Sequence, residues 1–436
     1  MDKYPMKVRE GVRRIIRQMD DMVGSFAKDP QVDFTRHRKL PFRTLIWFLL
    51  CMQGQSLDKE LLNAFRFDPD LPTVSALVQG RAKLHENTMP FLFSEVVRAF
   101  SCNAKKKRYR LIACDGSDLH YPSNPAETED VFVTKENARP YNLMHLNALY
   151  DVTNQRFLDA VIQSGRHEDE VGAAVQLIDR FPFDENAIFT LDRGYECYNV
   201  MAHIIERGMK FLIRVKNPDS VGILRRLQLP VDTAFDLSFS YSLTRKKTNF
   251  VKENPHLFRI LKKDLRFDFC DLHHAFFYPI SFRAVSIRLP SGAYEYLITN
   301  LDPDLFPPDK IKDLYHRRWD IETAFRALKY VLSLNAFHSK KAEFIRQEVF
   351  ARLILYNLCC LIAAHAALSH RTRSYVYKVN FSTSVAICRH FFLSSDSSPP
   401  DVVMLIRQHL VPIRPGRSDP RKVCSHPAIH FFCRIA

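Results

Sequence analysis

A change in hydrophobic pattern near residue 108 is the feature that most limits the folds open to this chain. Before this point apolar residues recur at helical spacing. Three largely apolar segments with the pattern of strands follow it, RYRLIACDG (108–116), LMHLNALYD (143–151) and RFLDAVIQ (156–163). Helical and strand patterns then alternate through 167–181, 187–194, 197–207 and 210–216. Three successive strands followed by alternating helix and strand predict a mixed α/β sheet instead of a fully doubly wound one.

The pattern on either side of this sheet divides the chain into five predicted parts. Residues 1–104 have helical periodicity, in 41–52, 57–65, 73–84 and 88–101, and residues 105–216 form the first part of the α/β core. Residues 217–300 alternate or are aromatic and β-branched, which predicts a β-rich insertion without a helix. Residues 301–360 return to the core with one long helix from about 308 to 332. Residues 361–436 are helical at first and end in a predicted extended arm, VPIRPGRSDPRKV (411–423).

The charge of the chain favours a polyanionic partner. Lys and Arg number 63 against 48 Asp and Glu, a net charge of +15, in a chain whose 46% apolar content is that of a folded protein. Such an excess most often serves nucleic-acid binding, with an anionic membrane surface as the competing explanation. No basic amphipathic segment of the membrane-binding type stands out, and the longest apolar runs, 45–52 and 353–368, are too short to span a bilayer.

The cysteines indicate a reducing compartment. The ten cysteines contain no CxxC pair and no zinc-finger spacing. The N-terminus has charge without a following apolar segment, so it lacks the pattern of a signal peptide. We therefore expect a cytoplasmic protein with reduced cysteines.

The segment YHRRWDIETAFRALK (315–329) concentrates groups that bind metal and phosphate. Tyr315, Arg318, Glu322 and Lys329 have offsets of 0, 3, 7 and 14. On an α-helix these offsets fall within about 60° of one another, and Arg326 projects nearly the same way. A separate apolar stripe, Leu314, Ile321, Phe325, Leu328 and Leu332, predicts burial of the opposite side. A solvated charged helix face is the alternative that this spacing alone leaves open.

Two aspartates occupy matching places at the ends of predicted strands. Asp115 ends the first strand in CDGSD, and Asp192 ends the fourth in LDRGY. Gly116 and Gly194 follow closely, which predicts a tight turn that leaves each carboxylate unobstructed. In open sheets, reacting groups gather beyond the carboxyl ends of strands. A capping or turn role is the alternative for either aspartate alone.

Glu322 would complete a group of three carboxylates without evident neutralising partners. Such a group is stable at neutral pH when cations neutralise it, and hard oxygen ligands select Mg²⁺ or Mn²⁺. Two such ions about 4 Å apart would activate a water or a 3′-hydroxyl for in-line attack on a phosphodiester. The three carboxylates therefore predict a metal-dependent nucleic-acid enzyme.

These segments together resemble the DDE transposases of bacterial insertion sequences, in the IS-four group with the Y-(2)-R-(3)-E-(6)-K signature. Tyr315-(2)-Arg318-(3)-Glu322-(6)-Lys329 matches that signature without departures. DGS (115–117) and DRGY (192–195) resemble the segments around the group's first and second catalytic aspartates, and LITNL (297–301) and the RW-x-IE arrangement around Trp319 are also similar. The resemblance spans about residues 105–360, while the N-terminal 100 residues match only in general character.

The resemblance implies a fold and a reaction. The fold would be an RNase H-like core interrupted by a β-rich insertion between 192 and 322. Asp115, Asp192 and Glu322 would ligate two Mg²⁺ ions, with Mn²⁺ able to substitute, and Tyr315, Arg318 and Lys329 would hold phosphates near the transposon end. The group commonly excises through a DNA hairpin at each end and then joins the 3′ ends to target DNA.

The expected partners follow from that reaction. They are transposon-end inverted-repeat DNA, target DNA and a second copy of the chain, because both ends must be handled together. Residues 1–104 would bind the transposon ends, and the cytoplasmic protein would associate with the nucleoid. The helix at 72–84, capped by Thr73, fits either a recognition helix of a helix-turn-helix or a core helix with snorkelling basic residues.

Further DNA contacts are predicted at other basic and aromatic residues. Trp319 suits stacking on a flipped base, although a packing role is the alternative. Arg193 and Tyr195 flank the second aspartate, with a salt bridge and a core phenol as alternatives. The remaining candidates are Arg326 and the N-terminal basic residues Arg36, Arg38, Lys39, Arg81 and Lys83.

Three other functions remain open at this point. A DNA-binding repressor or domesticated transposase would keep the fold without cutting. A nuclease of the same fold would hydrolyse DNA without joining a cut 3′ end to target DNA. A membrane-surface protein would bind lipid independently of Asp115.

Overall fold

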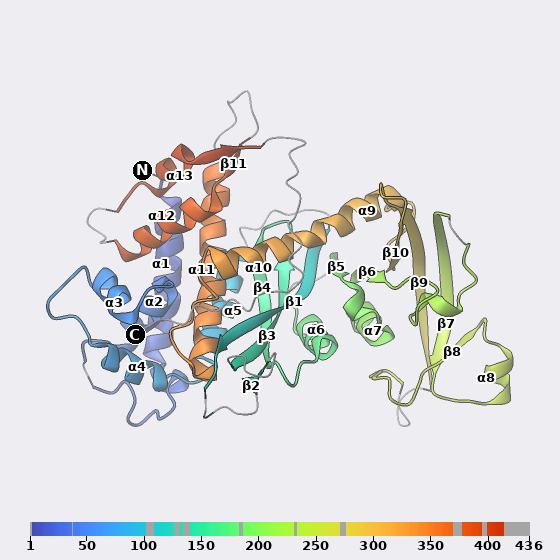
Figure 1. The fold of residues 1–436 in the computed structure, drawn as a ribbon, viewed down its shortest axis with the longest axis horizontal. Coiled ribbons are helices and arrows are strands. Elements are labelled where there is room, and N and C mark those ends of the chain that lie inside the picture. The colour runs from blue at the N-terminus through green and yellow to red at the C-terminus, as the bar shows by residue number, and fades with distance from the viewer. Residues whose placement is uncertain are drawn as a thin grey trace.

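The computed structural model describes residues 2–36, 38–101, 109–124, 126, 131–133, 140–182, 186–230, 233–270, 276–368, 377–394 and 399–413. The basic tail beyond Ile413 lies outside these residues. Helices from both ends of the chain pack together at one end of an elongated molecule, and a sheet extends from them to the insertion strands at the other end (Figure 1). The predicted mixed α/β fold with helical N- and C-terminal regions is confirmed.

One mixed sheet of ten strands, counted over the described residues, forms the centre of the fold. Its order is β2 (Val131–Phe132), β3 (Tyr141–Asp151), β1 (Arg110–Pro122), β5 (Ala187–Leu191), β6 (Lys210–Val215), β10 (Tyr294–Thr299), β9 (Phe277–Arg288), β7 (Phe235–Thr244) and β8 (Phe258–Ile260), with β4 (Arg156–Ser164) also paired to β3. β1, β3 and β4 are antiparallel, while β5 and β6 run parallel to β1. This is the arrangement expected of the RNase H-like core.

β1 is longer than its sequence pattern predicts. Asp115 was expected to end the strand, but β1 continues to Pro122 and pairs with β3 along this whole extension. Its parallel partner β5 ends earlier, since the last parallel pair is Cys114 with Leu191. The sheet therefore loses a neighbour at Asp115, although the strand does not end there.

The insertion strands extend the core sheet. β10 pairs antiparallel with β6, β9 with β10, and β7 with β9. The region is rich in strands, as predicted, but it also contains the short helix α8 (Asn249–Glu253), which was not expected. The five sequence boundaries remain a prediction.

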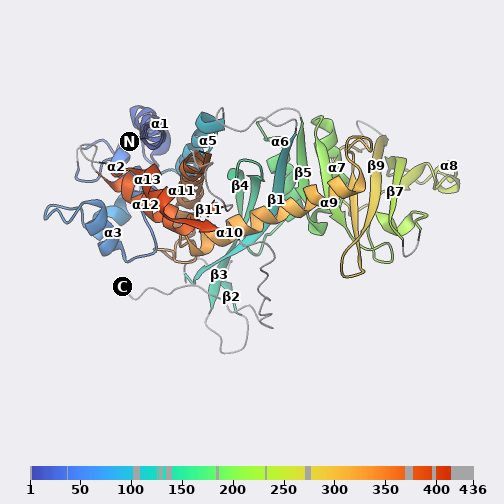
Figure 2. The same cartoon turned by 90° about the horizontal axis from the view of Figure 1, so that it is seen from above.

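Helices cover both sides of the core strands. α6 (Glu170–Asp179) packs on β3 and β4, and α7 (Tyr198–Glu206) packs on β6. Figure 2 shows these two helices on one side of β1 and β5, with α9 (Pro308–His316) and α10 (Asp320–Tyr330) on the other. The single long helix predicted over 308–332 is divided, because a 3₁₀ turn, η5 (Arg317–Trp319), separates α9 from α10. A 3₁₀ stretch within a helix often marks a functional site or a hinge.

The predicted N-terminal helices are present. They are α2 (Phe42–Cys51), α3 (Leu57–Ala64), α4 (Val74–Ala82) and α5 (Thr88–Ser101), preceded by α1 (Tyr4–Asp21). α12 (Phe381–Leu393) and α13 (Val402–Gln408) pack with α11 (Ala342–Leu368). Among the described residues, α11 is the one helix long and apolar enough to cross a membrane. However, 89% of its apolar window is buried in the protein, as in a core helix.

Arg81 joins the N-terminal helices to α11. Its side chain is 1% exposed and bonds through all three nitrogens: Nε to Gln347, Nη1 to Glu348 at 3.0 Å, and Nη2 to the Phe344 carbonyl. The predicted DNA contact of Arg81 is therefore wrong, because no part of this guanidinium reaches the surface. Its role is structural.

Glu348 is the centre of this buried ionic group. Burial alone would raise its pKa, but His338 and Arg81 outweigh that effect and lower the pKa to about 2. His338 Nδ1 lies 3.0 Å from Glu348. Because the pKa is lowered on folding, the stabilisation is present above the unfolded value near 4.5 and is lost as the pH falls toward about 2.

Removing Arg81 should strongly destabilise the protein. Arg81→Met removes one of the two partners that compensate the buried charge of Glu348 and leaves His338 as the other, so we expect a loss of about 3 kcal/mol in the free energy of unfolding. Lys83→Met is the matched control: Lys83 pairs with Asp33 at 3.3 Å near the surface and should cost less than about 1 kcal/mol. Urea unfolding at pH 7 measures both. Equal stability of the two variants would contradict the structural role.

Candidate active site

The parallel pairing of β1 and β5 places Asp115 beside Asp192. Each aspartate directly follows the last parallel pair of the two strands. Asp192 is the N-cap of η3 (Arg193–Tyr195), and its carboxylate accepts a 2.7 Å hydrogen bond from the Arg193 amide. Asp115 accepts a 3.0 Å bond from the Gly116 amide. Local backbone bonds thus fix both carboxylates at one edge of the sheet.

Gly116 is required for close packing, and not for the tight turn that the sequence predicts. A Cβ at this position would lie 2.2 Å from His145 Nε2 and 2.7 Å from Glu170 Oε1. Successive residues of a strand face opposite sides of the sheet, so Asp115 faces away from these two side chains. The glycine therefore lets a second polar group pack directly behind the catalytic position.

The α9–η5–α10 segment brings the third carboxylate to the two aspartates. Arg318 Nη1 lies 3.1 Å from Asp115 Oδ2, and Arg318 Nη2 lies 2.8 Å from Glu322 Oε1. The Tyr315 hydroxyl donates a 3.3 Å hydrogen bond to Asp192 Oδ1. The structure thus brings together five residues that the sequence singled out.

Arg318 is a neutralising partner of the carboxylates, which the sequence did not predict. The three carboxylates were expected to lack a neutralising partner, but this guanidinium, which is 2% exposed, neutralises two of them. Its predicted contact with DNA phosphate stays a prediction; in this arrangement each Nη already donates to one carboxylate. Tyr315 is equally buried, at 2% exposure.

The three carboxylates are close enough for the charges of two of them to shift the pKa of the third. Burial is the main cause that raises the pKa of Asp115 to about 6, and the charges of Glu322 and Asp192 raise it further against the opposing effect of Arg318. Burial also raises the pKa of Tyr315, so its phenol stays protonated and acts as a donor. A cation that binds here would relieve the remaining repulsion.

The donor set fits a hard divalent cation. Carboxylates from β1, from the end of β5 and from α10 supply only oxygen ligands, which is the preference of Mg²⁺ and Mn²⁺. Asp115, Asp192 and Glu322 are therefore suited to hold the metal that the sequence predicts.

The other residues predicted to contact DNA around the site differ in how exposed they are. Arg193 and Arg326 are exposed, and Trp319 is 40% exposed, so all three can meet a ligand. Lys329 is half-buried; burial lowers its pKa, with Asp118 opposing. Tyr195 is 2% exposed, so its predicted DNA contact is wrong and the core-phenol alternative holds.

The N-terminal basic residues line a groove beside α4. Arg36, Arg38, Lys39 and Lys83 lie around a hollow of about 660 Å³ together with Thr73, Ala76 and Gln79 of α4 and its cap. Lys39 forms an ion pair with Asp70. Leu77 and Arg81 bury one side of α4, while Ser75, Ala76, Val78 and Gln79 are exposed. α4 therefore has both a core face and an open face.

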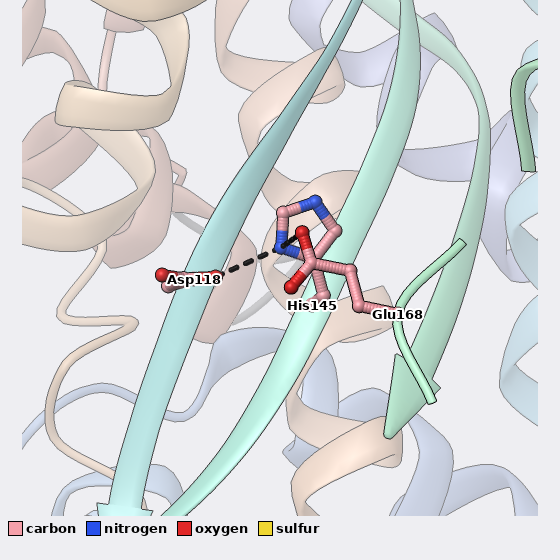
Figure 3. A group of neighbouring side chains, drawn as sticks. All are labelled: Asp118, His145 and Glu168. Carbon is pink, nitrogen blue, oxygen red and sulfur yellow. Dashed lines mark hydrogen bonds and ion pairs between the residues drawn. The ribbon is translucent and has the colours of Figure 1, made fainter. Parts of the chain in front are cut away.

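Asp118, His145 and Glu168 form a second polar group at β1 and β3 (Figure 3). Because successive residues of a strand face opposite sides of the sheet, Asp118 faces away from the side of Asp115. His145 Nδ1 on β3 is 2.8 Å from Asp118 Oδ1 on β1 and 3.4 Å from Glu168 Oε1, and its Nε2 is 3.1 Å from Glu170 Oε1 without hydrogen-bond geometry. Asp118 lies on the extended part of β1 and His145 on β3, and the sequence alone assigned no role to either residue. A single histidine inside the apolar run LMHLNALYD was the available signal.

The charge state of His145 decides what this group does. Asp118, His145 and Glu168 place their ligand atoms within 4.8 Å of one another, close enough for a metal ion. Burial opposes charging of His145, yet the carboxylates of Asp118 and Glu170 beside its ring nitrogens, together with the charge of Glu168, raise its pKa to about 9. With carboxylates at both ring nitrogens, we expect an imidazolium that ties β1 and β3 to the start of α6.

His145→Gln should therefore show a pH-dependent stability loss. Because the pKa is raised from 6.5 to about 9, the stabilising charge is fully present below 6.5 and is lost as the pH rises through about 9. The difference in melting temperature from wild type should shrink between pH 6 and 10. His120→Gln on the neighbouring strand β1 is the control, because burial lowers the His120 pKa below 6.5 and so moves its titration away from the alkaline range in which His145 is expected to lose its charge. If a chelator removes the difference in melting temperature between wild type and His145→Gln, the group holds a metal ion and not an imidazolium.

Comparison with known proteins agrees with this geometry. A family model described as "Transposase DDE domain" matches residues 106–358, a range that contains Asp115, Asp192 and the whole 315–329 segment. The transposase InsG for insertion sequence element IS4 of Escherichia coli is 22% identical over 90% of this chain and 87% of its own length. The transposase for insertion sequence element IS231E of Bacillus thuringiensis subsp. finitimus is 19% identical over 48% of each chain.

A solved structure of the piggyBac transposase synaptic complex with hairpin DNA covers 95% of this chain and 87% of that chain, with a TM-score of 0.46 and 10% identity. The family match covers more than half of the sequence and includes every carboxylate of the site. The chain therefore belongs to the family of transposases with a DDE domain, and it is a DNA transposase of the IS-four type.

Proposed function

We propose that this transposase cuts transposon ends and joins them to target DNA by a metal-dependent reaction at Asp115, Asp192 and Glu322. The observation that carries the proposal is the convergence of three carboxylates from three separate elements. Asp115 and Glu322 share the Arg318 guanidinium, and Asp192 lies beside Asp115 where the parallel pairing of β1 and β5 ends. Elements that are 77 and 130 residues apart in sequence would not bring like charges together for stability alone.

Each residue has a defined part in this mechanism. The three carboxylates would hold two Mg²⁺ ions, with Mn²⁺ able to substitute, and the bound ions would supply charge stabilisation for in-line displacement at a phosphodiester. Tyr315 fixes the orientation of Asp192 through its hydrogen bond. The short η5 turn sets Glu322 toward the aspartates and Trp319 toward the surface.

The DNA would lie along the exposed side of α10. Trp319, Thr323, Arg326 and Tyr330 recur at helical spacing and are all exposed. This stripe offers two aromatic rings and a guanidinium next to the carboxylates, which suits a distorted or unpaired DNA end. Arg193 borders the same site after Asp192, and Lys329 follows Glu322 by two turns.

The groove beside α4 would bind the transposon end away from the chemistry. Its basic rim suits phosphates, and the open face of α4 carries Gln79 and Ser75, which can hydrogen-bond base edges. We further propose inverted-repeat ends and target DNA as substrates, excision through hairpins, and a homodimer that holds both ends. The cytoplasm is the expected compartment. The membrane-surface alternative is set aside by membership of the family.

Conservative replacement of each carboxylate should abolish cleavage without abolishing binding. For Asp115→Asn, Asp192→Asn and Glu322→Gln we expect at least about a 100-fold loss, or roughly 3 kcal/mol of the barrier. A labelled transposon-end duplex with Mg²⁺ measures cleavage, and a mobility shift measures binding. Asp313→Asn, an exposed carboxylate on α9, is the matched control and should keep wild-type activity.

The same assay separates the alternatives. Binding by the wild type without cleavage in Mg²⁺ or Mn²⁺ would favour the repressor. Cleavage without transfer of the cut 3′ end to target DNA would favour the nuclease, and a hairpin product would support the proposed excision route.

The groove should control binding through its charge. Arg36→Ala with Arg38→Ala should weaken binding to the transposon end and reduce the salt slope by about 1 for each lost phosphate contact. Arg98→Ala on α5, an exposed arginine paired with Glu95, is the control and should leave the slope unchanged. Fluorescence anisotropy between 50 and about 200 mM salt measures both. An unchanged slope in the double variant would place end binding elsewhere.

A further inference from the structure

Arg318 is held by two carboxylates that come from different elements. Asp115 belongs to β1 and Glu322 to α10, and each contributes one oxygen to the guanidinium. Arg318 is 2% exposed, while the side chains of Asp115 and Glu322 are 20% and 35% exposed, so the guanidinium is the desolvated member of each pair. Loss of its partners is costly for such a buried cation unless another negative charge takes their place. The same two carboxylates are two of the three proposed metal ligands.

The bonding of Arg318 is incomplete compared with that of a structural arginine. Arg81 bonds through all three of its nitrogens to α11 and its neighbouring residues. In Arg318 only the two Nη atoms are bonded, and the buried Nε has no hydrogen-bond partner among the described residues. Nothing except the two carboxylates holds this head group by hydrogen bonds in the part of the chain that the structure describes.

The guanidinium also has a short path toward the surface. Its centre lies 5.9 Å from the Tyr315 ring and 5.4 Å from the Trp319 ring. Tyr315 is buried, but Trp319 is 40% exposed and belongs to the side of α10 along which DNA is proposed to lie. The flexible stem of an arginine can move its charge by several ångströms along such a ring.

Charge balance sets the competition at this site. Asp115, Asp192, Glu322 and the neighbouring Glu295 carry four negative charges. Two positive charges face them: Arg318, and Arg214, which lies 3.9 Å from Asp192 and 3.5 Å from Glu295. Divalent cations would compete with Arg318 for these carboxylates, because Arg318 now bonds Asp115 Oδ2 and Glu322 Oε1. Once cations bind these oxygens, the guanidinium faces like charge, and a phosphate becomes its best available partner.

We propose that Arg318 exchanges partners, holding Asp115 and Glu322 together in the metal-free enzyme and turning to a DNA phosphate when divalent cations take the carboxylates. This inference rests on the proposed function of the three carboxylates as metal ligands. Arg318 is then a positioning residue that couples two binding events. By linkage, Mg²⁺ strengthens DNA binding by the same factor as DNA strengthens Mg²⁺ binding.

The experiment measures binding and not turnover. The probe is a transposon-end duplex already cut at its end, which leaves no phosphodiester at the end to cleave. Its affinity is measured by fluorescence anisotropy with and without Mg²⁺, and Mg²⁺ affinity is measured by titration calorimetry with and without the duplex. For wild type we expect Mg²⁺ to raise DNA affinity about tenfold, within the usual range of coupling.

The variants separate exchange from a fixed ion pair. Arg318→Ala should bind Mg²⁺ about tenfold more tightly in the absence of DNA, since no guanidinium has to leave, and most of the coupling should disappear. Arg326→Ala is the matched control on α10; it should weaken DNA binding by the same factor with and without Mg²⁺. Arg318→Lys keeps one charge but cannot bridge both carboxylates, so it should give an intermediate coupling between Mg²⁺ and DNA binding. If Arg318→Ala does not fold, Arg318→Lys serves as the test of partner exchange.

Two outcomes overturn the inference, and they differ. Unchanged coupling or weaker Mg²⁺ binding in the Arg318 variants would make Arg318 a fixed structural ion pair and leave the metal mechanism in place. No Mg²⁺ binding by the wild type, with or without DNA, would overturn the exchange together with the proposed metal function.

Discussion

The parallel pairing of β1 with β5 is the constraint on which the active site depends. The pairing ends at Cys114 and Leu191, and the next residue of each strand is a catalytic candidate. The hydrogen-bond register of the two strands therefore places Asp115 and Asp192 at neighbouring positions across the sheet. β1 continues beyond this point only because β3 still pairs with it, so the carboxylate of Asp115 is held on a rigid strand with one side left open.

The α9–η5–α10 segment covers this open side of β1, and the 3₁₀ turn η5 interrupts its helix. A straight helix from α9 into α10 would present Tyr315, Arg318 and Glu322 on one face, which is what their spacing suggests. The η5 turn tightens the backbone at Arg317–Trp319, so that Tyr315 reaches Asp192 while Arg318 reaches Asp115 and Glu322. Tyr315 and Arg318 of the signature thus contact the two strand-end aspartates and are not turned to solvent.

Much of this was accessible from the sequence. Apolar periodicity gave α2 to α5 and the core strands to within a few residues, because burial imposes that period. The grouping of Asp115, Asp192 and Glu322 followed from their positions after predicted strands and on one helix. The extension of β1, the 3₁₀ turn and the pairing of β10 with β6 did not, because they depend on partners distant in the chain. Contacts of Arg36, Arg38, Lys39, Lys83, Arg193, Arg326, Trp319 and Lys329 with DNA stay predictions.

The arginines show most clearly where sequence reasoning stops. Arg81, Arg318 and Arg326 all belong to helical segments with basic character, and composition assigns the same role to each. Burial separates them: Arg81 is enclosed with every nitrogen bonded, Arg326 is exposed, and Arg318 is enclosed with one nitrogen unbonded. A fully bonded buried cation stabilises a fold, whereas an incompletely bonded one beside acidic ligands is held in a state that another cation can displace. The degree to which a buried charge is satisfied is therefore the property that distinguishes a structural arginine from one that takes part in binding.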